Sequence, residues 1–228
     1  MKIRAIITGA TGMVGEGVLL ECLRSSDVEA ILVLGRKPIG IKHRKLREVL
    51  HADFQNLSAI ENELTGYNAC FFCAGISSVG VSKPEYERIT HDLTLHVAHT
   101  LVRLSPEMTF EYVSGDGTDS REQSRSHWAR VKGRTENELL ALPFRQAYMF
   151  RPGLMRPVPG QRNVPRLMRA IAWFYPVVRR LAPAHACELR DVGQAMIAAV
   201  LEGYPQPVLE VADIVALAHG KVAAHSRA

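Results

Sequence analysis

Three glycines spaced three residues apart, Gly9, Gly12 and Gly15, follow the apolar run 3–8 and precede a helical pattern. An apolar, β-branched run that stops at a glycine predicts a buried strand. Glycines at this spacing allow a tight turn and a close approach of backbone to a pyrophosphate, which then rests on the helix N-terminus. This turn, at the first strand–helix junction, therefore predicts dinucleotide binding. A plain tight turn is the alternative.

The sequence Leu34-Gly35-Arg36-Lys37 stands where an NAD site would place an acid on the ribose hydroxyls. Two cations without a carboxylate at that strand end suit a 2′-phosphate. Arg36 and Lys37 therefore predict NADP (NADPH) as the cofactor rather than NAD. The alternative is a solvated loop arginine.

Several short motifs together resemble an atypical short-chain dehydrogenase/reductase. They are the glycine turn, Cys73-Ala74-Gly75, Ser114 and the sequence Trp128-Ala129-Arg130-Val131-Lys132. The resemblance is greatest to the NAD(P)H-binding branch that includes the Tat-interacting-protein-like oxidoreductases. It covers residues 1–155 well and the remainder loosely.

The resemblance implies a set of cofactor contacts. It implies that the turn residues line the pyrophosphate, that Arg36 holds the 2′-phosphate, and that Lys132 binds a ribose. It also implies one pair of residues at the adenine, another along the nicotinamide ribose, and a proline near the carboxamide. The turn residues are Thr11, Gly12, Met13 and Val14, the adenine pair is Asp53 with Phe54, the ribose pair is Ala74 with Gly75, and the proline is Pro152.

The chain departs from this family at the residue that handles the proton. Family members that transfer hydride use Tyr-x-x-x-Lys, whose two side chains lie one helical turn apart on one face. Here the lysine is Lys132, but the tyrosine position holds Trp128. An indole N–H donates a hydrogen bond and does not titrate usefully. We therefore expect poor ordinary ketoreductase activity, and a packed aromatic is the equally favoured interpretation of Trp128.

Few side chains are candidates to replace the missing acid. Ser114 lies 14 residues before Trp128, where the family places a substrate-orienting serine, and its hydroxyl is a poor acid alone. His127 adjoins Trp128, but about 100° around the helix. Asp116 follows in a Gly-Asp-Gly loop and would serve if its pKa were raised. The sequence does not choose between His127 and Asp116.

Cysteines and histidines are spaced unlike metal ligands. Cys70 and Cys73 lie three residues apart on a predicted strand, so they point to opposite faces, which favours buried structural cysteines. His91, His96 and His99 include no pair at four-residue spacing, which favours surface or packing roles. We expect no metal site.

Strand and helix patterns alternate along the chain. Strands are predicted near residues 3–8, 30–34, 49–50, 68–73, 109–114 and 146–151. Helices are predicted after Gly12, from a capping box at Ser82, over 126–142 and over 189–201. This alternation predicts an α/β, doubly wound parallel sheet, the Rossmann arrangement. We expect a single domain over 1–228, with a dinucleotide-binding core (1–155), a small substrate-side lobe (156–228) and a frayed tail (221–228).

Composition fits a soluble globular chain, with 47% hydrophobic and 22% charged residues. The first residues do not form a signal peptide, and the longest strongly apolar stretch, 170–178, is about half of a membrane span. The four cysteines do not form a secreted disulfide pattern. We therefore expect a reducing compartment and a cytoplasmic location.

Basic residues concentrate in one segment. Residues 156–190 contain seven arginines against one acid, Glu188, in a chain whose net charge is +5. The segment has three interpretations. It forms a substrate lobe that binds a phosphate or carboxylate, it lies on an anionic membrane surface through Trp173 and its aromatic neighbours, or it is a solvated face over core aromatics.

Together these features predict an NADP(H)-binding protein of the atypical short-chain dehydrogenase/reductase type. We expect either a weak or specialised oxidoreductase that lacks the usual tyrosine acid, or a non-catalytic NADP(H)-sensing or scaffold protein. A peripheral membrane-associated binder is the third interpretation. The expected partners are NADP(H) and a small-molecule substrate, with no nucleic acid. The sequence leaves monomer and homodimer open.

Overall fold

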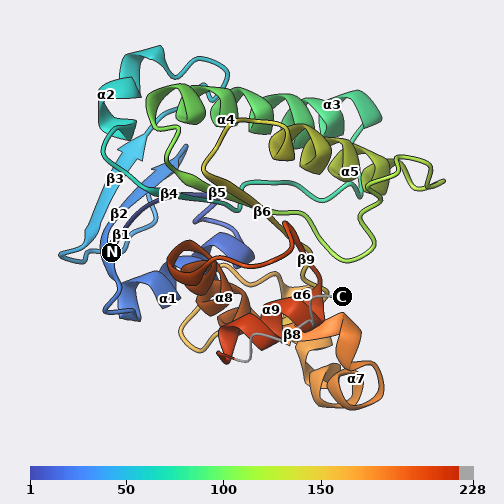
Figure 1. The fold of residues 1–228 in the computed structure, drawn as a ribbon. Helices are drawn as coiled ribbons and strands as arrows, with labels where there is room; N and C mark the ends of the chain where they lie inside the picture. The colour runs from blue at the N-terminus through green and yellow to red at the C-terminus, as the bar shows by residue number, and fades with distance from the viewer. Residues whose placement is uncertain (221–228) are drawn as a thin grey trace.

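Residues 1–220 are described in the computed structural model, and they build one parallel sheet between two helical layers (Figure 1). The tail predicted at 221–228 lies outside the described residues. Every neighbouring pair of strands in this seven-stranded sheet is parallel. Across the sheet the strands are β3 (Leu46–Leu50), β2 (Val28–Gly35), β1 (Ile3–Thr8), β4 (Ala69–Phe72), β5 (Thr109–Val113), β6 (Gln146–Phe150) and β9 (Val208–Leu209).

Apolar side chains on both faces of the strands explain the two helical layers. In β1, Ile3, Ala5 and Ile7 belong to one core and Ile6 to the other, because successive strand residues point to opposite faces. The first core lies between the sheet and α1 (Met13–Arg24), α8 (Leu189–Glu202) and α9 (Val211–Ala218), on the lower side of the sheet in Figure 1. The second lies under α4 (Leu93–Leu104) and α5 (His127–Leu140), with a 3-10 turn (Ser58–Ile60) and α2 (Glu61–Leu64) at its edge. The predicted doubly wound α/β fold is confirmed.

The long helix predicted from Ser82 is interrupted. Ser82 Oγ accepts a hydrogen bond from the N–H of Glu85 at 3.4 Å and caps α3 (Lys83–Glu87). A π-helical turn (Arg88–Asp92) then separates α3 from α4. Such single π-turns are frequent at functional sites.

The strand order creates a crevice next to β1. The chain runs from β1 outward to β2 and β3, then returns to β4 on the other side of β1. In open parallel sheets, ligands bind outside the carboxyl ends of the strands at such a switch point. The fold therefore directs attention to the ends of β1 and β4.

The last third of the chain divides between the main sheet and an appended layer. Strand β9 pairs with β6, and α8 and α9 pack beneath the sheet, so these elements complete the core. Neither β9 nor α9 was predicted from the sequence. The appended layer holds β7 (Leu154–Arg156), α6 (Arg166–Ile171), a 3-10 turn (Ala172–Phe174), α7 (Tyr175–Leu181), a second 3-10 turn (Pro183–His185) and β8 (Ala186–Glu188), with β7 parallel to β8.

Candidate functional site

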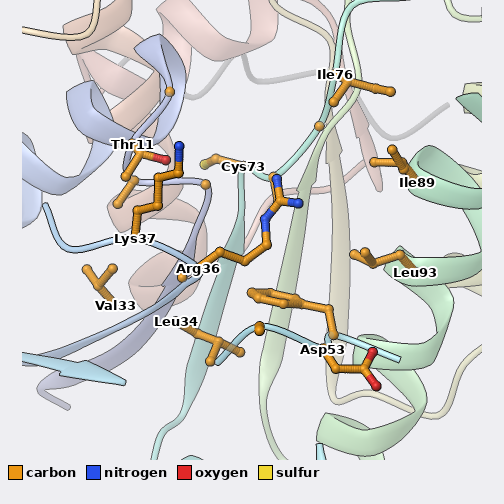
Figure 2. Close-up of a pocket in the computed structure, with 18 of the residues that line it drawn as sticks. Thr11, Val33, Leu34, Arg36, Lys37, Asp53, Cys73, Ile76, Ile89 and Leu93 are labelled. Carbon is orange, nitrogen blue, oxygen red and sulfur yellow. The ribbon is translucent and has the colours of Figure 1, made fainter. Parts of the chain in front are cut away.

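A pocket of about 400 Å³ opens at the carboxyl ends of β1, β2, β3 and β4 (Figure 2). Residues 9–12 form one wall, and residues 33–37, 52–55 and 73–76 form the floor and sides. Arg88 and Ile89 of the π-turn, with Leu93 of α4, line the opposite side. The helical interruption therefore faces the pocket.

Backbone crowding explains the glycine turn. Gly9 has φ +71°, and a Cβ there would lie 2.5 Å from the carbonyl oxygen of Cys73. A Cβ on Gly15 would lie 2.3 Å from the carbonyl oxygen of Gly9. Gly12 is the N-cap of α1 and contributes no side-chain hydrogen bond, so the first N–H groups of α1 are left for another acceptor. An anionic ligand at this end would supply it.

Positively charged side chains outnumber acidic ones in the lining of the pocket. Figure 2 shows the side chains of Arg36 and Lys37 reaching across the pocket, while the carboxylate of Asp53 points away from both. Asp53 Oδ1 accepts a hydrogen bond from the N–H of Gln55 at 2.9 Å. Among the pocket residues that the structure describes, Asp53 is the only acid, whereas Arg88 adds a third cation. The pocket thus suits a ligand with several negative charges.

The residues predicted to bind the cofactor divide into two groups. Nine of them line this pocket, namely Gly9, Thr11, Gly12, Arg36, Lys37, Asp53, Phe54, Ala74 and Gly75. Met13, Val14, Gly15, Lys132 and Pro152 lie outside its lining. Ile76, Arg88, Ile89 and Leu93 line it without having been predicted. The helical periodicity indicated a packed face for Ile89 and Leu93, and nothing in the sequence distinguished pocket from core.

A second polar cluster lies at the ends of β5 and β6. Ser114 Oγ donates to Glu136 Oε1 at 2.5 Å, and the backbone carbonyl of Ser114 accepts from Lys132 Nζ. Arg151 Nε donates to the same Glu136 oxygen at 3.0 Å, and Arg151 also pairs with Glu210 at 3.0 Å. Glu136 is fully buried, so this pairing offsets part of the cost of burying its charge. The Ser114 hydroxyl, predicted to orient a substrate, is hydrogen-bonded into the protein.

The buried ammonium of Lys132 has a lowered pKa. Burial lowers its pKa to about 8, and the nearby Glu136 carboxylate opposes this shift. Trp128, Lys132 and Glu136 follow each other at four-residue spacing on α5, so they share one helix face. A Cβ on Gly117 would lie 3.4 Å from Cη2 of Trp128, so the indole packs against the loop after β5. Trp128 thus occupies a packed position at the edge of the site.

The two candidate acids have different surroundings. His127 Nε2 donates to Glu87 Oε1 of α3 at 3.2 Å, and its ring lies 6.2 Å from that of Tyr86. His127 is therefore held on the α3 side of α5. Asp116 instead accepts a hydrogen bond from Nδ1 of His185 at 2.6 Å. His185 was not predicted, because its partner is 69 residues away and no local pattern marks the contact.

The cysteines lie as the strand alternation predicted. Cys70 is buried in the core under α4 and α5, whereas Cys73 packs against the opposite core and lines the pocket. Burial raises the pKa of both thiols. No helix in the described part of the chain is both long enough and apolar enough to cross a bilayer.

Comparison with known proteins identifies a family match. The model of the NAD dependent epimerase/dehydratase family matches residues 5–127. The protein FMP52-2, mitochondrial, of Scheffersomyces stipitis is 30% identical over 158 residues, which cover 68% of this chain and 67% of that protein. Protein HTATIP2 of Rattus norvegicus is 25% identical over 151 residues, covering 65% of this chain and 61% of the relative.

Solved structures share the fold at low identity. The enzyme WbmG of Bordetella bronchiseptica in complex with NAD has a TM-score of 0.66 and 13% identity, covering 98% of this chain and 79% of that one. A UDP-N-acetylglucosamine 4-epimerase from Methanobrevibacter ruminantium has a TM-score of 0.65 and 14% identity, covering 91% and 76%. These likenesses establish the fold.

The comparisons correct our expectation about location. Relatives from Scheffersomyces stipitis, Emericella nidulans and Debaryomyces hansenii are named as mitochondrial proteins. The prediction of a cytoplasmic protein is therefore wrong. That prediction rested on the spacing of the cysteines in the sequence, and such spacing cannot distinguish one compartment of the cell interior from another.

Proposed function

Because the chain belongs to the NAD dependent epimerase/dehydratase family, in its atypical short-chain dehydrogenase/reductase branch, we propose that it binds NADP(H) in the crevice beside β1. We further propose that it is a specialised oxidoreductase that works without the tyrosine acid of its family.

The observation that carries the cofactor assignment is the charge at the end of β2. Arg36 and Lys37 reach into the pocket, and the pocket's one described acid, Asp53, is turned away and capped by Gln55. An acid on the ribose hydroxyls is the usual NAD feature, whereas an arginine accommodates a 2′-phosphate. Hydrogen bonds from a guanidinium to phosphate are charge-assisted and about twice as strong as neutral ones.

The remaining pocket fits the rest of a dinucleotide. The free N–H groups at the start of α1 would hold the pyrophosphate, and Phe54 offers an apolar surface for adenine. A Cβ on Gly75 would meet nothing within 4 Å, which leaves space along the end of β4 for a ribose. Lys132, whose ammonium lies on the carbonyl of Ser114, would hold the second ribose.

The chemistry of the site follows from what its residues supply. Bound NADPH would supply a hydride. Lys132 would orient the nicotinamide end, and Trp128 would pack against it without giving a proton. General acid catalysis contributes about 10²–10⁴-fold to such reactions. We therefore propose that acceptors with little need for a positioned acid, such as quinones, are reduced more readily than simple ketones unless another residue supplies the proton.

Cofactor fluorescence tests the assignment. NADPH is expected to bind at least about tenfold more tightly than NADH, because only NADPH carries the 2′-phosphate. Arg36→Ala should remove most of this preference. Arg44→Ala, an exposed arginine outside the pocket lining, is the matched control and should keep it. Equal affinities for the two cofactors in the unaltered protein would refute the assignment.

A non-catalytic role is the second candidate, and Trp128 is the observation that favours it. A protein that senses NADP(H) or serves as a scaffold needs Lys132 and the pocket but no proton donor. The two functions differ in turnover. Oxidation of NADPH by quinones or carbonyl compounds supports the oxidoreductase, whereas tight binding without turnover supports the sensor.

A membrane surface is a further partner that the appended layer favours. Trp173, Phe174 and Leu181 are 88%, 66% and 78% exposed, which is unusual for large apolar side chains gathered on one lobe. Arg166, Arg169 and Arg180 are exposed beside them and make no ion pair with a described residue. Exposed apolar side chains and arginines within one segment fit the interface of an anionic bilayer.

A further inference from the structure

A histidine from the appended layer is hydrogen-bonded to an aspartate of the central sheet. His185 closes the 3-10 turn Pro183–His185, and its Nδ1 donates to Asp116 Oδ2 at 2.6 Å. The side chains are 63% and 34% exposed, respectively, so water reaches both. An imidazole oriented by a carboxylate through Nδ1 is the arrangement that keeps Nε2 available for proton transfer.

The backbone around Asp116 is fixed. The N–H of Asp116 donates to the carbonyl oxygen of Pro152 at 2.9 Å, which ties the loop after β5 to the end of β6. Gly115 and Gly117 on either side have positive φ angles of 147° and 83°. Thr118 Oγ1 donates to the carbonyl of Gly115 at 2.7 Å. The carboxylate is thus presented by a tight, doubly anchored loop.

The backbone around His185 is fixed as well. A Cβ on Gly153 would lie 2.3 Å from the carbonyl oxygen of His185, so the turn docks where residue 153 has no side chain. Arg179 Nη1 donates to the carbonyl of Ala186 at 2.9 Å and to that of Pro183 at 3.3 Å. The contact between the two layers at this point is therefore built by backbone packing as well as by the hydrogen bond between His185 and Asp116.

Asp116 lies in the loop that the proposed active site uses, and His185 is hydrogen-bonded to it from the appended layer. Two residues before Asp116, the carbonyl of Ser114 accepts from Lys132, and one residue after it, Gly117 packs against Trp128. Trp128 stands in the position of the missing acid, and His127 is held by Glu87. Asp116 and His185 thus add a titratable pair to the loop that links Lys132 and Trp128.

On the basis of the proposed function, we propose that His185 is the proton donor for carbonyl reduction and that Asp116 is its positioning residue. In the reduction, the carbonyl carbon accepts the hydride that NADPH supplies, and the C=O π pair moves to the oxygen. That oxygen takes the proton from Nε2 of the His185 imidazolium, which gives the alcohol and a neutral imidazole. The exposed imidazole then regains a proton from water.

The other charged groups next to the turn Pro183–His185 do not replace the hydrogen bond between His185 and Asp116. Elements packed on the 3-10 turn contribute Arg179 and Arg180 from α7 and Asp213 from α9. Asp213 is engaged by Tyr204, and Arg179 by backbone carbonyls. Among the described ion pairs, Asp116 is the sole carboxylate that His185 contacts.

The test compares His185→Gln and Asp116→Asn with a matched control. His219→Gln is that control, since His219 is an exposed histidine paired with Asp191 at 3.4 Å, with Asp191 on α8. NADPH binding is followed by fluorescence, and NADPH oxidation is measured with 4-nitrobenzaldehyde and with menadione, a quinone. The ¹⁵N chemical shifts of the His185 ring report which of its two nitrogens carries hydrogen. These signals are assigned as the ones that disappear in His185→Gln.

We expect aldehyde reduction to fall about 10²-fold or more in His185→Gln, while menadione reduction and NADPH binding stay within twofold of the unaltered protein. Asp116→Asn should lower aldehyde reduction and shift the His185 ring away from the Nδ1–H form. His219→Gln should change neither the aldehyde reduction nor the spectrum of the His185 ring. A second variant, His185→Ala, should lose aldehyde reduction as His185→Gln does, and added imidazole should restore part of it while leaving the unaltered protein unaffected.

The outcomes separate this proposal from the one on which it rests. If the unaltered protein does not bind NADPH, the proposed function itself is refuted. Intact binding and menadione reduction, with aldehyde reduction that His185→Gln leaves unchanged, would overturn the His185 proposal alone. Reduction of menadione by the unaltered protein without any reduction of the aldehyde would overturn it too. A ring spectrum that Asp116→Asn does not alter would overturn the positioning role of Asp116.

Discussion

Glu111 is a carboxylate in the middle of the sheet, and its replacement should change how stability depends on pH. It lies on β5 between Phe71 of β4 and Tyr148 of β6, and it is fully buried. Neither of its carboxylate oxygens has a hydrogen-bond partner among the described residues. Burial therefore raises its pKa well above the ordinary value of 4.5. We therefore expect the folded protein to keep this side chain protonated at pH values where the unfolded chain has already released the proton.

The direction of the pH effect follows from that raised pKa. Below pH 4.5 both folded and unfolded chains bind the proton, so the group costs nothing in linkage. Above pH 4.5 the unfolded chain releases the proton while the folded chain keeps it, and stability falls as the pH rises toward the folded pKa. The slope approaches about 1.4 kcal/mol per pH unit for one proton. Glu111→Gln has no proton to release and should lack this slope.

Urea denaturation at pH 5, 6 and 7 measures the effect. The free energy of unfolding of Glu111→Gln, relative to the unaltered protein, should rise with each pH unit by up to about 1.4 kcal/mol. Glu107→Gln removes an exposed carboxylate from the turn before the same strand and serves as the control. A difference between Glu111→Gln and the unaltered protein that stays constant from pH 5 to pH 7 would show that Glu111 is ionised in the fold and refute the reasoning.

Four further predictions probe the site and its surroundings. Trp128→Tyr, introduced into His185→Gln so that the proposed donor is absent, places a phenol one helical turn from Lys132 and should raise NADPH-dependent reduction of small ketones by about 10²–10⁴-fold over His185→Gln alone; no gain would show that a phenol at this position does not serve as the acid. Lys132→Ala should weaken NADPH binding in a fluorescence titration, with Trp128→Ala nearly unchanged, and the reverse order would contradict the ribose role of Lys132. Gly15→Ala pushes a Cβ to 2.3 Å from the Gly9 carbonyl and should lower both the melting temperature and NADPH affinity. Sedimentation with anionic vesicles should decrease with salt and with Trp173→Ala, and a protein that binds no vesicles at low salt would exclude the membrane partner.

Local patterns were sufficient for the six strands β1 to β6 of the main sheet and for nine of the residues that line the pocket. The strand before Gly9 and the cations after Gly35 are recognised by the spacing of residues that lie close together in the sequence. A single sequence therefore shows them directly. The same holds for Cys70 and Cys73, whose opposite faces follow from strand alternation.

Long-range contacts escaped prediction. The pairing of Glu136 with Arg151 and of Asp116 with His185 joins segments that only the folded sheet brings together. Ser114 was predicted to face a substrate, and its hydroxyl is instead bound to Glu136, whose burial no local pattern revealed. β9 is two residues long, which gave no period to detect.

The π-turn at 88–92 escaped prediction for a different reason. The apolar period through Ile89 and Leu93 is unbroken in the sequence, so it predicted one continuous helix. The interruption turns Arg88, Ile89 and Leu93 toward the pocket, and this depends on how the helix packs against the sheet.

Calorimetric titration with adenosine 2′,5′-bisphosphate and with 5′-AMP tests the central claim most directly. The two compounds share adenosine and a 5′-phosphate and differ by the 2′-phosphate alone, so the nicotinamide end plays no part. We predict at least about tenfold tighter binding of the bisphosphate, lost in Arg36→Ala and kept in Arg44→Ala. Equal affinities for the two compounds in the unaltered protein would contradict the assignment of this pocket to NADP(H).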